Sequence, residues 1–502
     1  MTLRTTIIQY SLHILLIIPL LLGLCSTMRG VNPVTPRLLT LQEVIDRAIQ
    51  QSPASKYAFN QRENAYWQYR NHKTSFRPSL YLNGNLPDFT STNSPITQPD
   101  GSVSFKNINL SRSSANFSLN QEIAATGTQL FAASDIMRID DFERNTVAYN
   151  SSPFMIGLRQ PIFGFNNSRW TKKIEPLRWE ESQKGFQEEM EQIAYDACVL
   201  FFQLLNVQTD VELARQNLKN SQANLKIAKV KKKLGIISEN DFERINLSVY
   251  NAKKALSRAT MNQKIAAFGL KSYIGTDLLE NILLLKPQEI PHLTIDVQKA
   301  LQQAITNRKE TPKLKRLLLE AERDRIRAKR NNGLTANLTA TYGLTNTGDN
   351  LQNLMDKAEV QKMVKLSFNI PVVDWGRSAS RVKMAESRHE LIKYEVDQLQ
   401  QKFEREVVVQ AEQFNLLYEQ LETSEQADLV AANGYQIALK QYQNGNLSIT
   451  DLNISLQERE QSRRDYINSL AQFWRAYYKI RILTLYDFEK NMPLIADNPK
   501  KD

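Results

Sequence analysis

The sequence predicts an α+β membrane protein in which a long antiparallel α-helical coiled-coil barrel continues a transmembrane β-barrel shared by several chains. Three observations predict this fold class. A short turn motif occurs twice, heptad repeats of apolar residues flank each copy, and a region of alternating apolar and polar residues precedes each heptad region. The same order of periodicities, met twice, indicates an internal two-fold repeat.

Each copy of the turn motif carries residues that end one helix and begin the next. Gly445 suits the left-handed conformation that closes a helix, Ser448 is an N-cap, and Asp451 places a carboxylate near the positive end of the new helix dipole. The matching residues of the first copy, 210 positions earlier, are Gly235, Ser238 and Asp241. We therefore expect two helical hairpins, with tips near residues 235 and 445.

Residues 1–25 resemble a secretory signal peptide, because Arg4 precedes an apolar run too short for a membrane-spanning helix. Ordinary cleavage shortly after Cys25 is the main hypothesis. Lipidation of Cys25 is the alternative, although Leu24 stands where a lipoprotein signal carries a small residue. Residues 26–39 are expected to be a linker, and the two cysteines of the chain give no disulfide framework.

The first repeat is expected over residues 40–275. An amphipathic helix begins at Thr40 and continues to about Phe76, with a bend or restart at Pro53. Period-two alternation follows, around 80–83, 116–120 and 154–159, and predicts strands. Heptads from Met190 to Ala228 and again after the tip then predict an antiparallel coiled coil, whose first helix is about 85 Å long from Leu177 to Lys233.

The second repeat is expected over residues 293–486, between a linker at 276–292 and a tail at 487–502. Leu293–Ile295 match Leu39–Leu41 at an offset of 254, whereas Pro371 matches Pro161 at an offset of 210. The 44-residue difference lies in the strand region of the first repeat. An extra hairpin at about 115–137, turning at 124–127, accounts for it, and the sequence leaves open whether this hairpin joins the sheet.

Alternation of this kind suits both a tilted transmembrane strand and a soluble sandwich strand. The context favours the membrane, because so few strands attached to such long coiled coils cannot close a sheet alone, and an open sheet edge cannot lie in lipid. We therefore expect three chains to share one barrel, of about 12 strands if each chain gives four and about 18 if each gives six.

Composition and motifs argue against other functions. The formal net charge is +11, but the aromatic residues are not interleaved with the basic ones as in a nucleic-acid interface, so no nucleic-acid partner is expected. The four histidines lie far from one another and from the cysteines in the sequence, and no phosphate-binding glycine loop or nucleophile motif occurs. We expect no enzymatic activity, cofactor or metal.

A family resemblance rests on three sets of residues: the tip motif G-x-x-S-x-x-D-[FL] met twice, the strand-to-helix turns at 161–164 and 371–376, and the start L-T-L-Q-E-V-I-D-R-A-I. Over residues 38–486 the chain resembles the TolC family of outer-membrane efflux proteins. The resemblance implies a homotrimer that crosses the outer membrane and extends into the periplasm. It implies a passive exit duct of a tripartite efflux or type I secretion system.

The resemblance also implies the partners and the site residues. A periplasmic adaptor protein would dock at the hairpin tips, and an inner-membrane pump, proton-driven or ATP-driven, would supply the cargo. The expected pore-gate residues are Tyr442, Asp451 and Asp241. The expected tip and adaptor-docking residues are Gly235, Ser238, Gly445, Leu447 and Ser448.

Each of these positions has a purely structural alternative. The two aspartates also suit helix starts alone, and Leu447 replaces the basic residue that ties neighbouring hairpins together in the family; Arg244 and Lys233 are substitutes for it. Basic residues close two helices, and we expect them either to be solvated or to contact partners. The first set, at the end of the helix before the first tip, would contact the adaptor and consists of Lys229 and Lys231–Lys233. The second set, just before a strand, would contact anionic lipid and consists of Arg323, Arg325, Arg327, Lys329 and Arg330.

Aromatic residues flank the strands, and either an interfacial belt or core packing accounts for them; they are Phe163, Phe165, Trp170 and Trp375. Two rival functions remain for the whole chain, a periplasmic adaptor (membrane fusion) protein and a structural coiled-coil protein. Two hairpins, each preceded by strands rich in Thr and Asn, argue against both.

Overall fold

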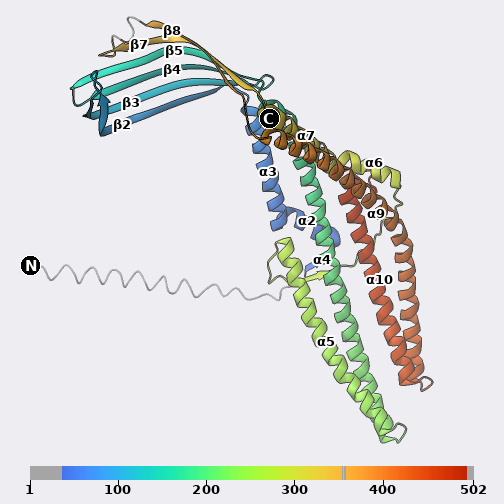
Figure 1. Cartoon of the computed structure of the whole chain (residues 1–502). Helices are drawn as coiled ribbons and strands as arrows, with labels where there is room; N and C mark the ends of the chain where they lie inside the picture. The colour runs from blue at the N-terminus through green and yellow to red at the C-terminus, as the bar shows by residue number, and fades with distance from the viewer. Residues whose placement is uncertain (1–36, 353, 355–357, 495–502) are drawn as a thin grey trace, which may run out of the picture. The chain divides into compact units, whose positions relative to one another are not determined.

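A computed structural model describes residues 37–352, 354 and 358–494. The expected signal peptide, Cys25 and most of the first linker lie outside these residues. The chain divides into two compact units, one formed by Met1–Gln51 and Ala197–Ile290, the other by Ser52–Asp196 and Pro291–Asp502. Helices and strands both contribute substantially, so the expected α+β class is confirmed (Figure 1).

The first unit contains strand β1 (Arg37–Leu39), helix α2 (Leu41–Gln51), the distal part of α4 (Asn167–Lys233), α5 (Glu239–Ile274) and β6 (Ile282–Leu284). Thr40 begins α2 with a capping box, since its hydroxyl accepts from Glu43 N and its own N donates to the Glu43 carboxylate at 2.8 Å. Short strands β1 and β6 pair in parallel, a contact that the sequence pattern does not predict.

Gly275 ends α5 in the left-handed conformation, with φ of 70°. A Cβ atom there would stand 2.9 Å from the carbonyl oxygen of Gln51 at the end of α2. Glycine is therefore required twice over at this position, for its backbone conformation and for the close approach of the two helix ends.

The second unit contains four helices, α3 (Pro53–Thr74), α6 (Val297–Asn307), α7 (Glu310–Asn331) and the proximal part of α4, together with the hairpin of α9 (Arg377–Gln443) and α10 (Ile449–Thr484). Ser52 caps α3, and Pro53 occupies its first turn, so the expected break at Pro53 is a restart. Short strands β9 (Tyr486–Asp487) and β10 (Met492–Pro493) follow α10.

A six-stranded antiparallel sheet belongs to the same unit (Figure 1). Its order is β2-β3-β4-β5-β7-β8, so consecutive strands are neighbours throughout. The strands are β2 (Ser79–Thr97), β3 (Val103–Ile123), β4 (Thr128–Asp141), β5 (Thr146–Ile162), β7 (Thr335–Gly348) and β8 (Glu359–Asn369). The extra hairpin turns at 124–127 as expected, and it enters the sheet as the pair β3–β4.

Helices of the two halves of the chain have pairwise equal lengths. Both α4 and α9 have 67 residues, and both α5 and α10 have 36, with starts 210 residues apart (377 − 167 and 449 − 239). Helices α2 and α6 have 11 residues each, but their starts lie 256 apart (297 − 41), two residues more than the sequence match at 254. These lengths agree with the heptad and capping patterns read from the sequence.

The hairpin of α9 and α10 buries the apolar seam that the heptads predict. Phe414 and Phe473 are fully buried, with ring centroids 5.3 Å apart, and Val407 and Leu470 lie in the same seam. Burial of such side chains contributes about 2 kcal/mol each. The summed burial of many such side chains along the seam stabilises this long pair of helices.

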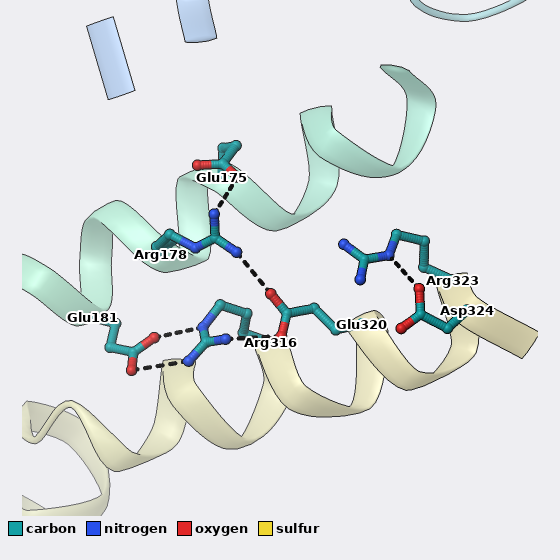
Figure 2. A network of polar contacts seen from close by, with 7 residues as sticks. All are labelled: Glu175, Arg178, Glu181, Arg316, Glu320, Arg323 and Asp324. Atoms are coloured by element: carbon teal, nitrogen blue, oxygen red, sulfur yellow. Dashed lines mark hydrogen bonds and ion pairs between the residues drawn. The ribbon is translucent and has the colours of Figure 1, made fainter. Parts of the chain in front are cut away.

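An ion-pair network joins α4 to α7 (Figure 2). Arg316 donates through Nε and Nη2 to Glu181 at 2.6 and 3.2 Å, and through Nη1 to Glu320 at 2.9 Å. Arg178 of α4 donates to the same Glu320 at 2.8 Å and to Glu175 at 2.7 Å. The guanidinium groups therefore bridge carboxylates of both helices and set their relative register.

Candidate functional site: the strand wall and the hairpin tips

One face of the sheet is mostly apolar, with Gln121 beside Leu130 and Lys362 beside Tyr342 among its exceptions. Residues paired across antiparallel strands point to the same side, so the pairing register defines each face. Two rows on this face are Leu80–Leu119–Ala132–Ile156–Tyr342 and Leu130–Leu158–Ala340–Val364. Most of these large apolar side chains are exposed, Val364 by 77%. A continuous exposed apolar surface of this extent requires an apolar partner.

The opposite face carries polar side chains. One row across it is Glu122–Gln129–Arg159–Thr339–Lys365. Phe131 is an exception on this face, and its ring covers Gly157, where a Cβ atom would stand 2.4 Å from the ring. The sheet therefore separates an apolar side from a water-compatible side, as the alternation in the sequence predicts.

Strands β2 and β8 form the two edges of the sheet, and each is paired on one side only. All 11 residues of β8 are exposed. No proline interrupts β8 and only Glu359 and two lysines carry charge, so the strand lacks most of the devices that keep sheet edges apart. Its free N–H and C=O groups are suited to pairing with another strand.

The second hairpin tip has the predicted caps. Asn446 N donates to Gln441 O at 2.9 Å across Gly445, whose φ is 83°, which is the hydrogen-bond pattern of a Schellman motif. Ser448 Oγ accepts from Asp451 N at 3.1 Å and donates to the Asp451 carboxylate at 2.7 Å. Asp451 thus has a definite structural role at the helix start, and its side chain is exposed.

The first hairpin tip, which belongs to the other compact unit, repeats these contacts. Ile236 N donates to Lys231 O at 2.9 Å across Gly235, whose φ is 71°. Ser238 Oγ accepts from Asp241 N at 3.0 Å and donates to the Asp241 carboxylate at 2.7 Å. The two tips are therefore built alike from like residues.

Tyr442 and Leu447 lie in a small core at the second tip. This tip core consists of Tyr435, Ala438, Tyr442 and Leu452, with Leu439, Leu447, Ile449 and Leu456 packed against it. Tyr442 is 7% exposed, and burial raises the pKa of its phenol. Leu447 is half-buried and packs against this core, which explains an apolar residue at that position. Tyr442 and Asp451 therefore occupy different environments, one inside the hairpin and one on its surface.

Lys232 and several basic residues of α7 have acidic or aromatic neighbours. Lys232 Nζ pairs with Glu239 at 2.7 Å and lies 4.2 Å from the centre of the Phe242 ring, which links the two sides of the first tip. In α7, Arg325 pairs with Glu322 at 2.6 Å, and Arg327 lies over Phe165 at 4.9 Å. Trp375 is 96% exposed in the turn that follows β8.

Asn166 joins the sheet to α4, a role that sequence reasoning missed. Its Nδ2 donates to Ala124 O at 2.9 Å and to Ala125 O at 3.2 Å, while its Oδ1 accepts from Arg169 N at 3.1 Å. One side chain therefore holds the β3–β4 turn and caps the first turn of α4. The signal was present as Asn166, Asn167 and Ser168, residue types favoured at helix starts, at the beginning of α4.

Within the described ranges, no helix is both long and apolar enough to cross a membrane. The same residues hold no group of three or more His, Cys, Asp or Glu side chains placed to bind a metal ion.

Comparisons with known proteins agree with this geometry. Residues 301–484 match the family described as outer membrane efflux protein, so the expected resemblance is confirmed. The fold is similar to the CmeC outer membrane channel of Campylobacter jejuni, with a TM-score of 0.65, 14% identity, and coverage of 91% of this chain and 87% of CmeC. No curated protein matches the chain in sequence.

Two further solved structures have the same fold. For the outer membrane protein VceC of Vibrio cholerae the TM-score is 0.60, the identity 12%, and the coverage 89% of this chain and 95% of VceC. For the open MtrE outer membrane channel of Neisseria gonorrhoeae the TM-score is 0.59, the identity 14%, and the coverage 88% of this chain and 88% of MtrE.

Proposed function

We infer that this chain, whose residues 301–484 match the outer membrane efflux protein family, is a channel of the bacterial outer membrane that serves as a passive exit duct in a tripartite efflux or type I secretion system. It acts as a homotrimer and extends into the periplasm. An inner-membrane pump, driven by protons or by ATP, delivers cargo to it, and a periplasmic adaptor docks at its helical tips. The duct itself performs no chemistry.

The observation that carries this proposal is the six-stranded sheet with one apolar face and two open edges. A sheet with free edges cannot be exposed to lipid, because each unpaired N–H or C=O group there costs several kcal/mol. Pairing β8 of one copy with β2 of the next removes every free edge at once. The apolar rows then face lipid, and the polar row of Glu122, Arg159 and Lys365 faces the lumen.

The hairpin tips support the second half of the proposal. Both expose a capped loop at the end of a long helical hairpin, with apolar residues at its apex in the first tip; Leu234 is 67% and Ile236 64% exposed. Tips of this kind offer a partner a defined surface at low entropic cost. Asp241 and Asp451, exposed beside the caps, are proposed to face the pore, and Tyr442 to support the gate from inside the hairpin.

The rival functions predict other behaviour. A periplasmic adaptor or a structural coiled-coil protein would be recovered without detergent and would not need strands with a lipid-facing side. Outer-membrane fractions should instead contain this chain as trimers that resist dissociation until heated. Recovery of a stable, soluble monomer would contradict the proposal.

Paired substitutions at the tip glycines test the docking role. Valine is strained at positive φ, so Gly235→Val combined with Gly445→Val should distort both tips. We expect export to be lost while insertion of the barrel into the outer membrane is retained. Gly434→Ala is the matched control, because Gly434 lies within α9 and a Cβ atom there meets nothing within 4 Å. Normal export by the double variant would show that the tips are not where the export complex assembles.

A further inference from the structure

Four helices of the second unit lie in a row, which their side-chain contacts define. The ring of Trp179 on α4 packs against Tyr66 and Tyr69 of α3, with centroids 5.7 and 5.8 Å apart. The network of Figure 2 joins α4 to α7. Lys329 of α7 pairs with Glu386 of α9 at 3.0 Å. The order of helices is therefore α3-α4-α7-α9.

The strands are attached to these helices in the same order. Helix α3 leads into β2, β5 leads into α4, α7 leads into β7, and β8 leads into α9. In the sheet, β2, β5, β7 and β8 follow one another in this sequence, but β3 and β4 stand between β2 and β5. The β3–β4 pair is thus the one pair with no helix of its own beneath it.

The lower end of this pair is fixed to the helices on either side. Asn166 holds the β3–β4 turn to the start of α4, as described above, and Ser168 of α4 is hydrogen-bonded to Glu122 of β3. Gln121 Nε2 donates to Phe76 O, just after α3, at 2.8 Å. The register between β3 and β4 is unbroken over 14 residue pairs, from Ile123–Thr128 to Leu110–Asp141. The β3–β4 pair is therefore a regular part of the sheet, anchored by side-chain hydrogen bonds.

We propose that the β3–β4 hairpin widens the barrel, so that three copies close into a single barrel of about 18 strands rather than about 12. The inference rests on the proposed function and deepens it. Barrel diameter grows roughly linearly with strand number, so the lumen is about one and a half times as wide as four strands per chain would give. Barrels of about this size leave an open aqueous channel.

The widths of the two layers agree with this proposal. Four helices packed about 9 Å apart span about 36 Å of circumference. Six strands spaced about 4.8 Å apart and tilted by about 40° span about 38 Å, whereas four would span about 25 Å. With six strands, the wall passes from helix to strand without narrowing. Cargo that fits the helical part of the duct therefore meets no narrower passage in the barrel.

Cysteine pairs test which strands close the barrel. We would combine Ser367→Cys, on the polar side of β8, with one cysteine on the same side of β2, using Tyr81→Cys, Asn83→Cys and Asn85→Cys in turn. Within one chain the two edges are five strands apart, too far for a disulfide, whose Cα atoms lie within about 7 Å. We expect at least one combination to give covalent trimers in outer membranes after mild oxidation, abolished by reduction.

The matched control asks whether β3 and β4 are left out of a smaller barrel, in which case β2 would lie directly beside β5. It combines Tyr81→Cys on β2 with Met155→Cys or Arg159→Cys on the same side of β5, because two strands separate β2 from β5 in the six-stranded sheet. We expect no disulfide within the chain from these pairs and no covalent trimer from Ser367→Cys alone. A disulfide between β2 and β5, or intact outer-membrane trimers without a β2–β8 cross-link, would overturn the inference. A strand count by electron cryomicroscopy of the trimer gives an independent reading, about 18 or about 12. Absence of the chain from outer membranes would refute the proposed function instead.

Discussion

Arg481 shows how much one side chain holds together in this chain. It is 15% exposed, and it donates through Nε and Nη2 to Glu191 of α4 at 2.8 and 3.1 Å and through Nη1 to Asp487 of β9 at 2.8 Å. Burial acts to lower the pKa of the guanidinium, but the contacts with Glu191 and Asp487 outweigh it and raise this pKa further above its usual range. The heptad pattern gave no sign of this contact, because it joins residues 290 positions apart.

Removing this guanidinium should destabilise the second unit strongly. Arg481→Met leaves Glu191 and Asp487 partly buried without their partner, which costs about 3–5 kcal/mol. The measurement is thermal or urea unfolding of the purified protein, followed by tryptophan fluorescence. Lys479→Gln is the control on the same helix, since its more exposed pair with Glu406 contributes less than about 1 kcal/mol. Equal effects of the two substitutions would refute the special role of Arg481.

Glu310 at the start of α7 gives a dependence of stability on pH. Burial raises the pKa of its carboxyl, although Arg308 beside it acts in the opposite direction. Between the unfolded pKa of about 4.5 and the higher folded pKa, the folded state binds more protons than the unfolded state. This group therefore makes folding more favourable as pH falls from neutral toward that window.

Comparison with Glu310→Gln isolates this effect. The unfolding free energy of the wild type, minus that of the variant, should increase between pH 7 and pH 5, because only the wild type gains a proton there on folding. Parallel urea titrations at several pH values provide the measurement. A difference that is flat, or that decreases toward acidic pH, would contradict the raised pKa.

At the scale of elements, the helical hairpins were predictable in detail. Their caps are local, because glycine, serine and aspartate in G-x-x-S-x-x-D satisfy backbone groups within a few residues. Both tips match this expectation, from Gly235 to Asp241 and from Gly445 to Asp451. The tip core around Tyr442 was less accessible to prediction, because helix rotation and not residue type decides whether an aromatic points into the hairpin.

The N-cap at the second tip should be measurable by hydrogen exchange. Ser448→Ala removes the acceptor for Asp451 N, which costs about 1 kcal/mol, so amides in the first turn of α10 should exchange about fivefold faster. Ser455→Ala, in the body of the same helix, is the control and should leave these amides unchanged. Unaltered exchange in the Ser448 variant would mean that packing alone holds the helix start.

The strand region was predictable only in part. Alternation identified the strands around residues 80, 117, 156, 338 and 366, because it depends on local geometry alone. Pairing is not local, so the sequence could not decide whether the extra hairpin enters the sheet. Asn166, which anchors that hairpin, also escaped notice, because its partners Ala124 and Ala125 are more than 40 residues away.

At the scale of the whole molecule, the two faces of the sheet should tolerate charge differently. Ala340 lies in an apolar row and Thr341, the next residue of β7, on the opposite face. In the proposed trimer, Ala340→Lys places a charge in lipid, which costs about 2–4 kcal/mol near the midplane, whereas Thr341→Lys faces water. We expect the first variant to assemble poorly into outer-membrane trimers and the second to assemble normally, as judged by heat-modifiable bands. The reverse ranking would mean that the faces are assigned the wrong way round.

The chain enters and leaves the β3–β4 hairpin at the same end of the sheet, so β2 and β5 on either side of it run in opposite directions and could pair directly if it were removed. An ancestral gene could accordingly acquire or discard such a segment in one step without re-routing the rest of the polypeptide. In the proposed trimer, the number of such hairpins therefore sets the width of the pore. Insertion of a further hairpin at the same site would widen the pore without changing the helical tips that contact the energised partner.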